Sequence, residues 1–194
     1  RGQQIQGIVG INGEDENDTP SGLNTTNFSI LENQGLDAGV VLGDLITLDQ
    51  DTNDSFTYSI IGGVDKNVFQ IGGTLNDQLI ITESNIDYET QDSYSVIIRT
   101  TDASNAHHDS LINISVVDQN EAPFDLTPTE FSILENTPVS TGIAIGSLNA
   151  SDPDFNESFS FNIVAGFDSE NFSITNSTLY FTHDAVDYEQ KTTF

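Results

Sequence analysis

The sequence predicts an all-β protein, built from tandem Greek-key antiparallel β-sandwiches of which the second is truncated. Apolar residues alternate with polar ones in short segments, for example at Phe56, Tyr58 and Ile60, and a period of two is that of a half-buried strand. Clusters of Gly, Asn and Asp separate these segments, and no stretch has a convincing helical period. About seven short strands in a unit of about 100 residues are typical of a β-sandwich.

An internal repeat organises the chain. Three motifs occur twice and in the same order: Phe-Ser-Ile-Leu-Glu-Asn at 28–33 and 131–136, Asp-x-Asp at 49–51 and 152–154, and Asp-Tyr-Glu at 87–89 and 187–189. The first two motifs return after 103 residues and the third after 100. The second copy has therefore lost three residues between these motifs.

A polar segment of the form Asp-x-Asn-acidic-x-Pro separates the repeats. It occurs at residues 15–20 and again at 118–123. We therefore expect residues 1–19 to be the end of a preceding repeat plus a linker. Residues 20–120 would be repeat A, and residues 121–194 would be repeat B, incomplete at its C-terminal end.

The two ends of the chain have unmatched strand patterns. Ile8, Val9 and Ile11 are the candidate apolar positions of a last strand that belongs to a preceding repeat. Repeat B has no counterpart of the alternating segments at 94–98 and 112–116, which follow Asp-Tyr-Glu in repeat A. Two interpretations stay open: the chain is a piece of a longer one, or neighbouring subunits of a fibre donate the missing strands.

The charge balance limits the classes of partner. The chain has 31 acidic and 4 basic residues, a formal net charge of −27. Nucleic acid and anionic membranes would repel it, whereas cations are natural partners; the alternative is an acidic surface adapted to salty water. There is no cysteine, so a disulfide framework is excluded, and no apolar run is long enough to span a membrane.

The acidic residues that both repeats retain fall at strand ends or in loops of the predicted pattern. Ca²⁺ takes about six to eight oxygen ligands and combines carboxylates with carbonyls, so an Asp-x-Asp turn suits it. Without a cation, two carboxylates about 4 Å apart repel by about 4 kcal/mol at an effective dielectric of about 20. Mg²⁺ prefers strict octahedral geometry, and Zn²⁺ would use His or Cys. The pattern therefore favours calcium.

Taken together, the motifs resemble the cadherin repeat. Leu-Glu-Asn, Asp-x-Asp, Asp-Tyr-Glu, Thr-Asp and a D-x-N-x-A-P linker stand in the order of that family. The variant is most similar to bacterial cadherin-like domains, where D-x-N-E-A-P linkers are common. The resemblance covers repeat A and the larger part of repeat B. It implies immunoglobulin-like sandwiches at an extracellular or cell-surface location, with calcium at each repeat junction rigidifying a rod for adhesion.

The resemblance also implies the ligands, residue by residue. For the junction between the repeats these are Glu32, Asp87, Glu89, Asp118, Gln119, Asn120, Glu121, Ala122, Asp152, Asp154 and Asn156, with backbone carbonyls from Gln119, Ala122 and Asn156. At the head of repeat A the equivalent ligands are Asn17, Thr19, Asp49, Asp51, Asn53 and Asp102, with backbone carbonyls from Thr19 and Asn53. Two ions would share Glu32, Glu89 and Glu121, and a third would lie between Asn120, Asp152 and Asp154.

The linker departs from the family pattern in two ways. Glu121 stands where animal cadherins usually have Asp, and the linker is one residue shorter than theirs. Because their following linker is absent, Glu135, Asp187 and Glu189 are expected to be empty or partly hydrated.

No enzyme motif is present: there is no nucleophile elbow, phosphate loop or histidine-metal motif. We therefore expect no catalysis, and we interpret His107-His108 as a solvated loop. The alternative to a structural rod is a carbohydrate-binding accessory module of a secreted protein, which would need a row of exposed aromatic residues. There is no Trp, and Phe and Tyr mostly occupy alternating, core-like positions. The expected partners are calcium, neighbouring repeats of the same chain, and homotypic or surface-ligand contacts.

Overall fold

The computed structural model describes residues 13–14, 16–24, 28–34, 39–166, 168–183 and 186–190. Its chain divides into two compact units, Arg1–Gln119 and Asn120–Phe194, called unit 1 and unit 2 below. The expected last strand of a preceding repeat, with Ile8, Val9 and Ile11, lies outside the described residues.

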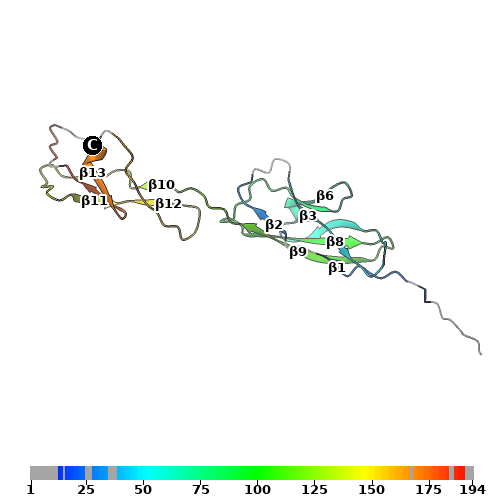
Figure 1. Cartoon of the computed structure of the whole chain (residues 1–194). Helices are drawn as coiled ribbons and strands as arrows, with labels where there is room; N and C mark the ends of the chain where they lie inside the picture. Colours follow the sequence, from blue (N-terminus) through cyan, green and yellow to red (C-terminus); the bar gives the residue numbers. More distant parts are fainter. Residues whose placement is uncertain are drawn as a thin grey trace, which may run out of the picture. The chain divides into compact units, whose positions relative to one another are not determined.

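Unit 1 is a sandwich whose described residues form two main sheets, with strand orders β2-β9-β8-β5 and β3-β7-β6 (Figure 1). The first sheet consists of β2 (Phe28–Leu31), β5 (Thr57–Gly62), β8 (Ser93–Thr101) and β9 (His107–Val117). The second consists of β3 (Val40–Asp44), β6 (Phe69–Gly72) and β7 (Gln78–Ile81). A short pair joins β1 (Gly22–Leu23) to β4 (Thr47–Leu48), and the 3₁₀ turn η1 (Lys66–Val68) precedes β6.

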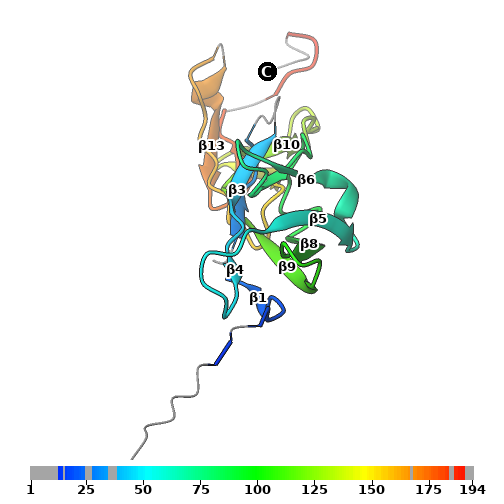
Figure 2. The ribbon, with the colours of Figure 1, turned by 90° about the vertical axis from the view of Figure 1, so that its right-hand side faces the viewer.

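The prediction of an all-β sandwich is confirmed. One strand pair of the first sheet is parallel, whereas the others are antiparallel. The pairs β5–β8 and β8–β9 are antiparallel, but β2 runs parallel to β9. The chain moves from the first sheet to the second after β2 and again after β5, as Figure 2 shows for β3, β5 and β6. Because no hairpin joins β2 to β9, no turn fixes their relative direction, and the antiparallel sandwich contains this one parallel pair among its described strands.

The core of unit 1 comes from alternate residues of both sheets. In β8, buried positions alternate with partly exposed ones along the strand, as the two-residue period of a strand requires. The apolar side chains without exposed surface are Leu79, Ile81, Val96, Ile98 and Ile114. This core fixes the strand ends from which the acidic loops emerge.

Unit 2 repeats part of this arrangement. In its described residues, β11 (Ile143–Ser147), β14 (Thr178–Phe181) and β13 (Phe172–Thr175) form a sheet of order β11-β14-β13. A second pair joins β10 (Phe124–Thr127) to β12 (Asn149–Ser151), and the 3₁₀ turn η2 (Ser169–Asn171) precedes β13. The order β11-β14-β13 matches β3-β7-β6 of unit 1.

The two units also share a bulge with a glycine. The register between β3 and β7 shifts before Gly43, and the register between β11 and β14 shifts before Gly146. A Cβ atom on Gly43 would lie 2.7 Å from Cε1 of Phe28, and one on Gly146 would collide with the ring of Phe131. In each unit the absence of a side chain therefore makes room for the phenylalanine of the Phe-Ser-Ile-Leu-Glu-Asn motif.

Unit 2 has a smaller core than unit 1. Its buried apolar residues are Val139, Leu148, Phe181 and Val186. The last three line an apolar cavity of about 1040 Å³ whose lining also includes Phe131 and Leu179. In unit 1, Phe28 and Leu79 occupy the corresponding positions and pack in the core with β8 and β9. The described residues of unit 2 contain no strands equivalent to β8 and β9.

Candidate cation sites at the ends of the repeats

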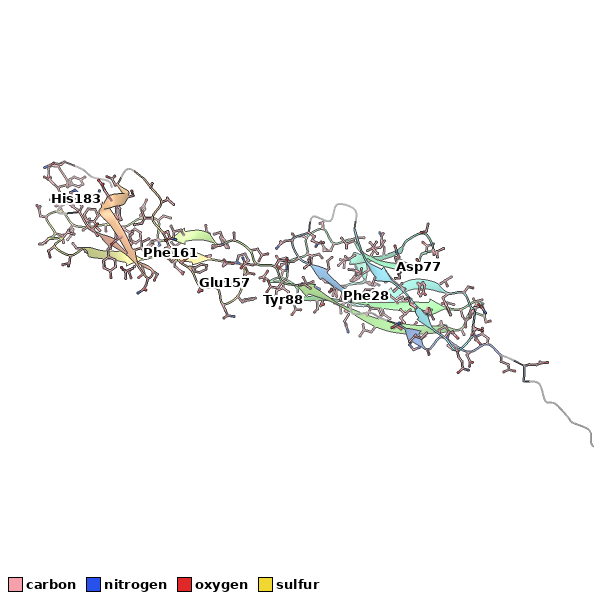
Figure 3. All side chains as sticks on the ribbon, viewed as in Figure 1. Phe28, Asp77, Tyr88, Glu157, Phe161 and His183 are labelled. Atoms are coloured by element: carbon pink, nitrogen blue, oxygen red, sulfur yellow. The ribbon has the colours of Figure 1, made fainter. Side chains whose placement is uncertain are left out.

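The turn after β2 buries an acidic side chain. Glu32 is only 2% exposed. Its Oε2 accepts a hydrogen bond from the backbone N–H of Tyr88 at 2.7 Å, and its Oε1 accepts one from the backbone N–H of Gln119 at 2.6 Å. Figure 3 shows Tyr88 at the end of unit 1 opposite to β1. Since burying a charge is costly unless it is hydrogen-bonded, these two donors explain how the carboxylate stays inside.

Glu32 belongs to a group of three carboxylates within unit 1. One oxygen each from Glu32, Glu89 and Asp118 lie within 4.8 Å of one another. The three residues are respectively buried, half-buried and exposed, so the group opens from the protein interior to solvent. Like charges at this spacing repel, and an all-oxygen donor set suits Ca²⁺ far better than Zn²⁺. The predicted residues therefore fit a calcium ion.

Asp87, a further predicted ligand, takes part in its own turn. Its Oδ1 accepts from the backbone N–H of Thr90 at 3.1 Å and its Oδ2 from the Thr90 hydroxyl at 2.9 Å. These bonds shape the Asp-Tyr-Glu turn that presents Glu89. Asp87 is not one of the group of three, whereas the same motif supplies Glu89 to it.

At the head of unit 1 the linker is tied to a second acidic site. Asp102 is 5% exposed, and its Oδ2 accepts from the Asn17 side-chain amide at 3.0 Å. Its Oδ1 accepts from the backbone N–H groups of Ser104 at 2.9 Å and Ala106 at 2.8 Å. The amide of Asn17, and then these backbone donors, hold the pKa of Asp102 below its ordinary value, so its carboxylate is charged at neutral pH.

The Asp-x-Asp turn completes this head site. The backbone N–H of Asp51 donates to Oδ1 of Asp49 at 2.9 Å, and the backbone N–H of Asp18 donates to Oδ2 of Asp51 at 2.6 Å. Oδ2 of Asp49 is buried and has no hydrogen-bond partner. A buried carboxylate oxygen without a donor is unfavourable, and a bound cation would satisfy it.

Asn53 follows this turn in a left-handed backbone conformation. Its φ is 70°, and its counterpart Asn156 in unit 2 has φ of 65°. Asn adopts this region more readily than most other residues. Both residues therefore have a turn-forming role, in addition to the carbonyl ligation expected of them. Thr19, also expected as a carbonyl ligand, is exposed in the linker.

One acidic residue of this site escaped the sequence prediction. Oδ2 of Asp54 is buried without a hydrogen-bond partner, and Asp54 lines a small pocket together with Asn17, Asp51 and Asn53. Its counterpart 103 residues later is Glu157. Both repeats therefore have an acidic residue at this position, and this repetition could have identified Asp54 from the sequence.

Unit 2 reproduces the linker contacts of unit 1. The backbone N–H of Glu121 donates to Oδ2 of Asp154 at 2.8 Å, and the N–H of Asp154 donates to Oδ1 of Asp152 at 3.1 Å. The side-chain amide of Asn120 donates to the carbonyl of Glu121 at 2.5 Å, while Ala122 is exposed. Hydrogen bonds within unit 2 thus connect Asn120, Glu121, Asp154 and Asp152 in turn.

Unit 2 also has a group equivalent to the one around Glu32. One oxygen each from Glu135, Asp187 and Glu189 lie within 4.8 Å of one another. Glu135 is exposed, and its Oε2 lies 3.4 Å from the Tyr188 backbone N–H. This contact is longer than the matching contact of Glu32, so the group is held less tightly.

The histidine pair lies in a strand, which corrects one expectation. β9 begins at His107, and His107 and His108 pair with Thr101 and Thr100 of β8. The interpretation as a solvated loop is wrong, because the turn between β8 and β9 is short and the ladder extends to its edge. Both residues are at least partly exposed.

Exposed apolar residues bear on the alternative of carbohydrate binding. In the described residues of unit 1, the large apolar side chains that are exposed are all aliphatic. The described residues of unit 1 therefore do not form the aromatic platform that this alternative requires; among those of unit 2 the exposed aromatic residues are Phe124, Phe155 and Tyr188. In the described part of the chain, no helix has the length and apolar character needed to cross a membrane.

The chain is similar to known proteins over most of its length. Residues 26–117 match the cadherin domain model. The chain is 26% identical to human cadherin EGF LAG seven-pass G-type receptor 1 over 96% of its length, and 31% identical to human protocadherin Fat 4 over 77%. It spans only 6% and 3%, respectively, of these two relatives.

Solved structures show the same fold. The crystal structure of human protocadherin-24 EC1-2 superimposes with a TM-score of 0.64 at 26% identity, covering 91% of this chain and 82% of that one. Cadherin repeats typically bind Ca²⁺, and they are extracellular and not enzymes. The family resemblance is therefore confirmed, whereas these animal relatives give no support to the expected bacterial subgroup.

Proposed function

We propose that this chain, whose residues 26–117 match the cadherin domain model, is a calcium-dependent structural module of an extracellular rod or fibre. Calcium ions at the repeat junctions would rigidify the chain for adhesion. Homotypic contacts and contacts with surface ligands follow from the same proposal.

The observation that supports the proposal best is the group formed by Glu32, Glu89 and Asp118. Three carboxylates whose oxygens lie within 4.8 Å of one another raise the free energy of the folded chain by mutual repulsion unless a cation is present. All three were expected as ligands from their motifs. The buried, unpartnered Oδ2 of Asp49 supports a further ion at the head of unit 1.

Calcium, when bound, would supply positive charge, and the protein and water would supply its oxygen ligands. The chain's own residues position the ligands. In unit 1, Asn17, Asp49, Asp51 and Asp102 would hold the head ion, with carbonyls of Thr19 and Asn53. We assign Glu32, Asp87, Glu89, Asp118 and the Gln119 carbonyl, with Asn120, Glu121, the Ala122 carbonyl, Asp152, Asp154 and the Asn156 carbonyl, to the junction between the repeats.

Isothermal titration calorimetry tests this proposal on the full chain after chelation. We expect saturable calcium binding at or below millimolar concentration, and a much weaker response to magnesium, which gives up its waters reluctantly. Absence of calcium binding at millimolar levels would overturn the proposal. Small-angle scattering with and without chelator then tests the mechanical part, because bound calcium should stiffen the segment at 118–123.

The bacterial character of the repeat stays a prediction. It depends on the D-x-N-E-A-P form of the linker at 118–123, in which Glu121 replaces the usual Asp. A Glu side chain is longer than an Asp side chain by one methylene, and this linker is shorter than that of animal cadherins by one residue. The longer side chain would allow Glu121 to reach the same ion from a shorter linker.

A further inference from the structure

The hydrogen bonds of Glu32 connect three segments of unit 1 that are far apart in sequence. Glu32 follows β2, Tyr88 lies in the Asp-Tyr-Glu turn, and Gln119 lies just beyond β9. The two carboxylate oxygens accept from these two backbone N–H groups, one each. We call these two bonds the Glu32 bridge.

The bridge fixes the neighbours of its two donors. Tyr88 is adjacent to Glu89, and Gln119 is adjacent to Asp118. Glu89 and Asp118 are the two residues whose carboxylates approach Glu32. A side chain that binds the backbone beside each of these residues therefore determines where both carboxylates lie.

Backbone bonds at the same turn support the bridge. The N–H of Glu32 donates to the carbonyl of Val117 at 3.2 Å, and the N–H of Asn33 donates to the carbonyl of Ile86 at 3.0 Å. The backbone of this turn therefore donates one hydrogen bond to each of the two segments that the Glu32 side chain also contacts. The burial of Glu32 excludes water from competing for its oxygens.

We infer that Glu32 is a positioning residue, which assembles the acidic group in unit 1 without any cation. An ionised carboxylate can accept about four hydrogen bonds, two at each oxygen. The bridge uses one position on each oxygen, so both oxygens keep a lone pair for a cation. That the assembled group then binds calcium depends on the function proposed above; the positioning itself does not.

The inference explains why a carboxylate is needed and not only a polar side chain. A glutamine of the same shape has one acceptor oxygen and one NH₂ group, and NH₂ can only donate. With Gln at this position, one of the two backbone N–H groups would face another donor. That N–H would then be buried without a partner, which proteins strongly avoid.

Amide hydrogen exchange of the full chain in excess chelator, followed by NMR, tests the inference. We expect Glu32→Gln to accelerate exchange by about tenfold or more at one of the two bridge amides, Tyr88 or Gln119, while the core amides of Val96 and Ile98 change much less. The control is Glu89→Gln, which removes a charge from the same group and leaves both bonds of the bridge in place. Equal effects of the two variants on Tyr88 and Gln119 would overturn the inference.

A second pair of variants covers the case in which Glu32→Gln unfolds. Glu32→Asp and Glu32→Asn have equal length, but only the Asp variant retains two acceptor oxygens. We expect protection of the Tyr88 and Gln119 amides to be greater in the Asp variant, and equal protection would contradict the positioning role. If wild-type protein shows the bridge by exchange but no calcium binding by calorimetry, the proposed function fails and the inference stands.

Discussion

The backbone N–H of Asp18 donates to Oδ2 of Asp51 at 2.6 Å, which ties the first linker to the Asp-x-Asp turn of unit 1. Unit 2 makes the same bond between Glu121 and Asp154. Each bond occupies one lone pair of one carboxylate oxygen. The linker backbone is thus held against the acidic turn in both units without a cation, while carboxylate oxygens stay available to bind one.

Replacing Asp51 by Asn tests whether this turn binds calcium. We expect calcium at about a hundredfold excess over its Kd to raise the free energy of unfolding of the wild type by about 2.7 kcal/mol. Asp51→Asn should lose much of that increase, because an amide gives the ion one neutral oxygen in place of a charged carboxylate. Urea unfolding in calcium and in chelator measures the difference. Asp44→Asn, which removes an exposed acid from β3, is the control, and an equal calcium response in both variants would contradict the assignment.

Gly43→Ala tests the packing of Phe28 against the bulge in β3. A Cβ atom at this position would lie 2.7 Å from Cε1 of Phe28, so the ring or the strand must move. We expect a loss of about 1–3 kcal/mol in the free energy of unfolding, because overpacking adds to the strain of a side chain at a φ of 156°. Urea denaturation measures this loss. Gly22→Ala is the matched control, since nothing lies within 4 Å of its added Cβ. If both substitutions have the same small effect, Phe28 is free to shift.

The strand pattern was largely predictable, because alternation reports burial directly. The buried positions of β8 follow the two-residue period, and the repeat offset predicted the shared arrangement of β3 with β7 and of β11 with β14. The parallel pairing of β2 with β9 was not predictable in this way. No local turn joins these strands, so the packing of the whole sandwich decides their direction.

The acidic residues were predictable from motif spacing, whereas the bonds that hold them were not. The donors to Glu32 are the backbone N–H groups of Tyr88 and Gln119, and almost every residue has such a group. No side-chain pattern can therefore reveal them. Asp54 is different, because comparison with Glu157 would have identified it as a retained acid.

Arg99→Gln tests the ion pair on the outer face of unit 1. Arg99 donates from Nε to Oδ1 of Asp109 at 2.7 Å and from a terminal nitrogen to Oδ2 at 2.9 Å. These hydrogen bonds are the main reason why the pKa of Asp109 lies below its ordinary value of 3.8. We expect the substitution to raise this pKa toward 3.8, as followed by NMR titration of the carboxyl carbon. Lys66→Gln, a substitution of another cation, should leave it unchanged.

The same pair has a defined dependence on pH. Because the folded-state pKa of Asp109 is lowered, its contribution to stability is present above the unfolded-state pKa and is lost as the pH falls through the folded-state value. The stability difference between wild type and Arg99→Gln should therefore be constant near neutral pH and vanish in acid. The difference should also be small, since the two side chains are 37% and 40% exposed and exposed ion pairs contribute little. A difference that grows in acid would contradict the assignment.

Leu79 and Leu179 occupy equivalent positions in the two units, where they pair with Gly43 and Gly146 respectively. Leu79 has no exposed surface, whereas Leu179 lines the apolar cavity of unit 2. We expect Leu79→Ala to lower the free energy of unfolding of unit 1 by about 2–5 kcal/mol. Leu179→Ala should cost unit 2 less, because a side chain beside a void loses fewer contacts.

NMR-detected urea unfolding separates the units through the amides of Ile98 and Tyr180. Leu75→Ala, at a side chain that is 80% exposed, should change the free energy by no more than about 0.5 kcal/mol. Equal costs at Leu79 and Leu179 would mean that the cavity of unit 2 is filled in solution, and that unit 2 packs as tightly as unit 1.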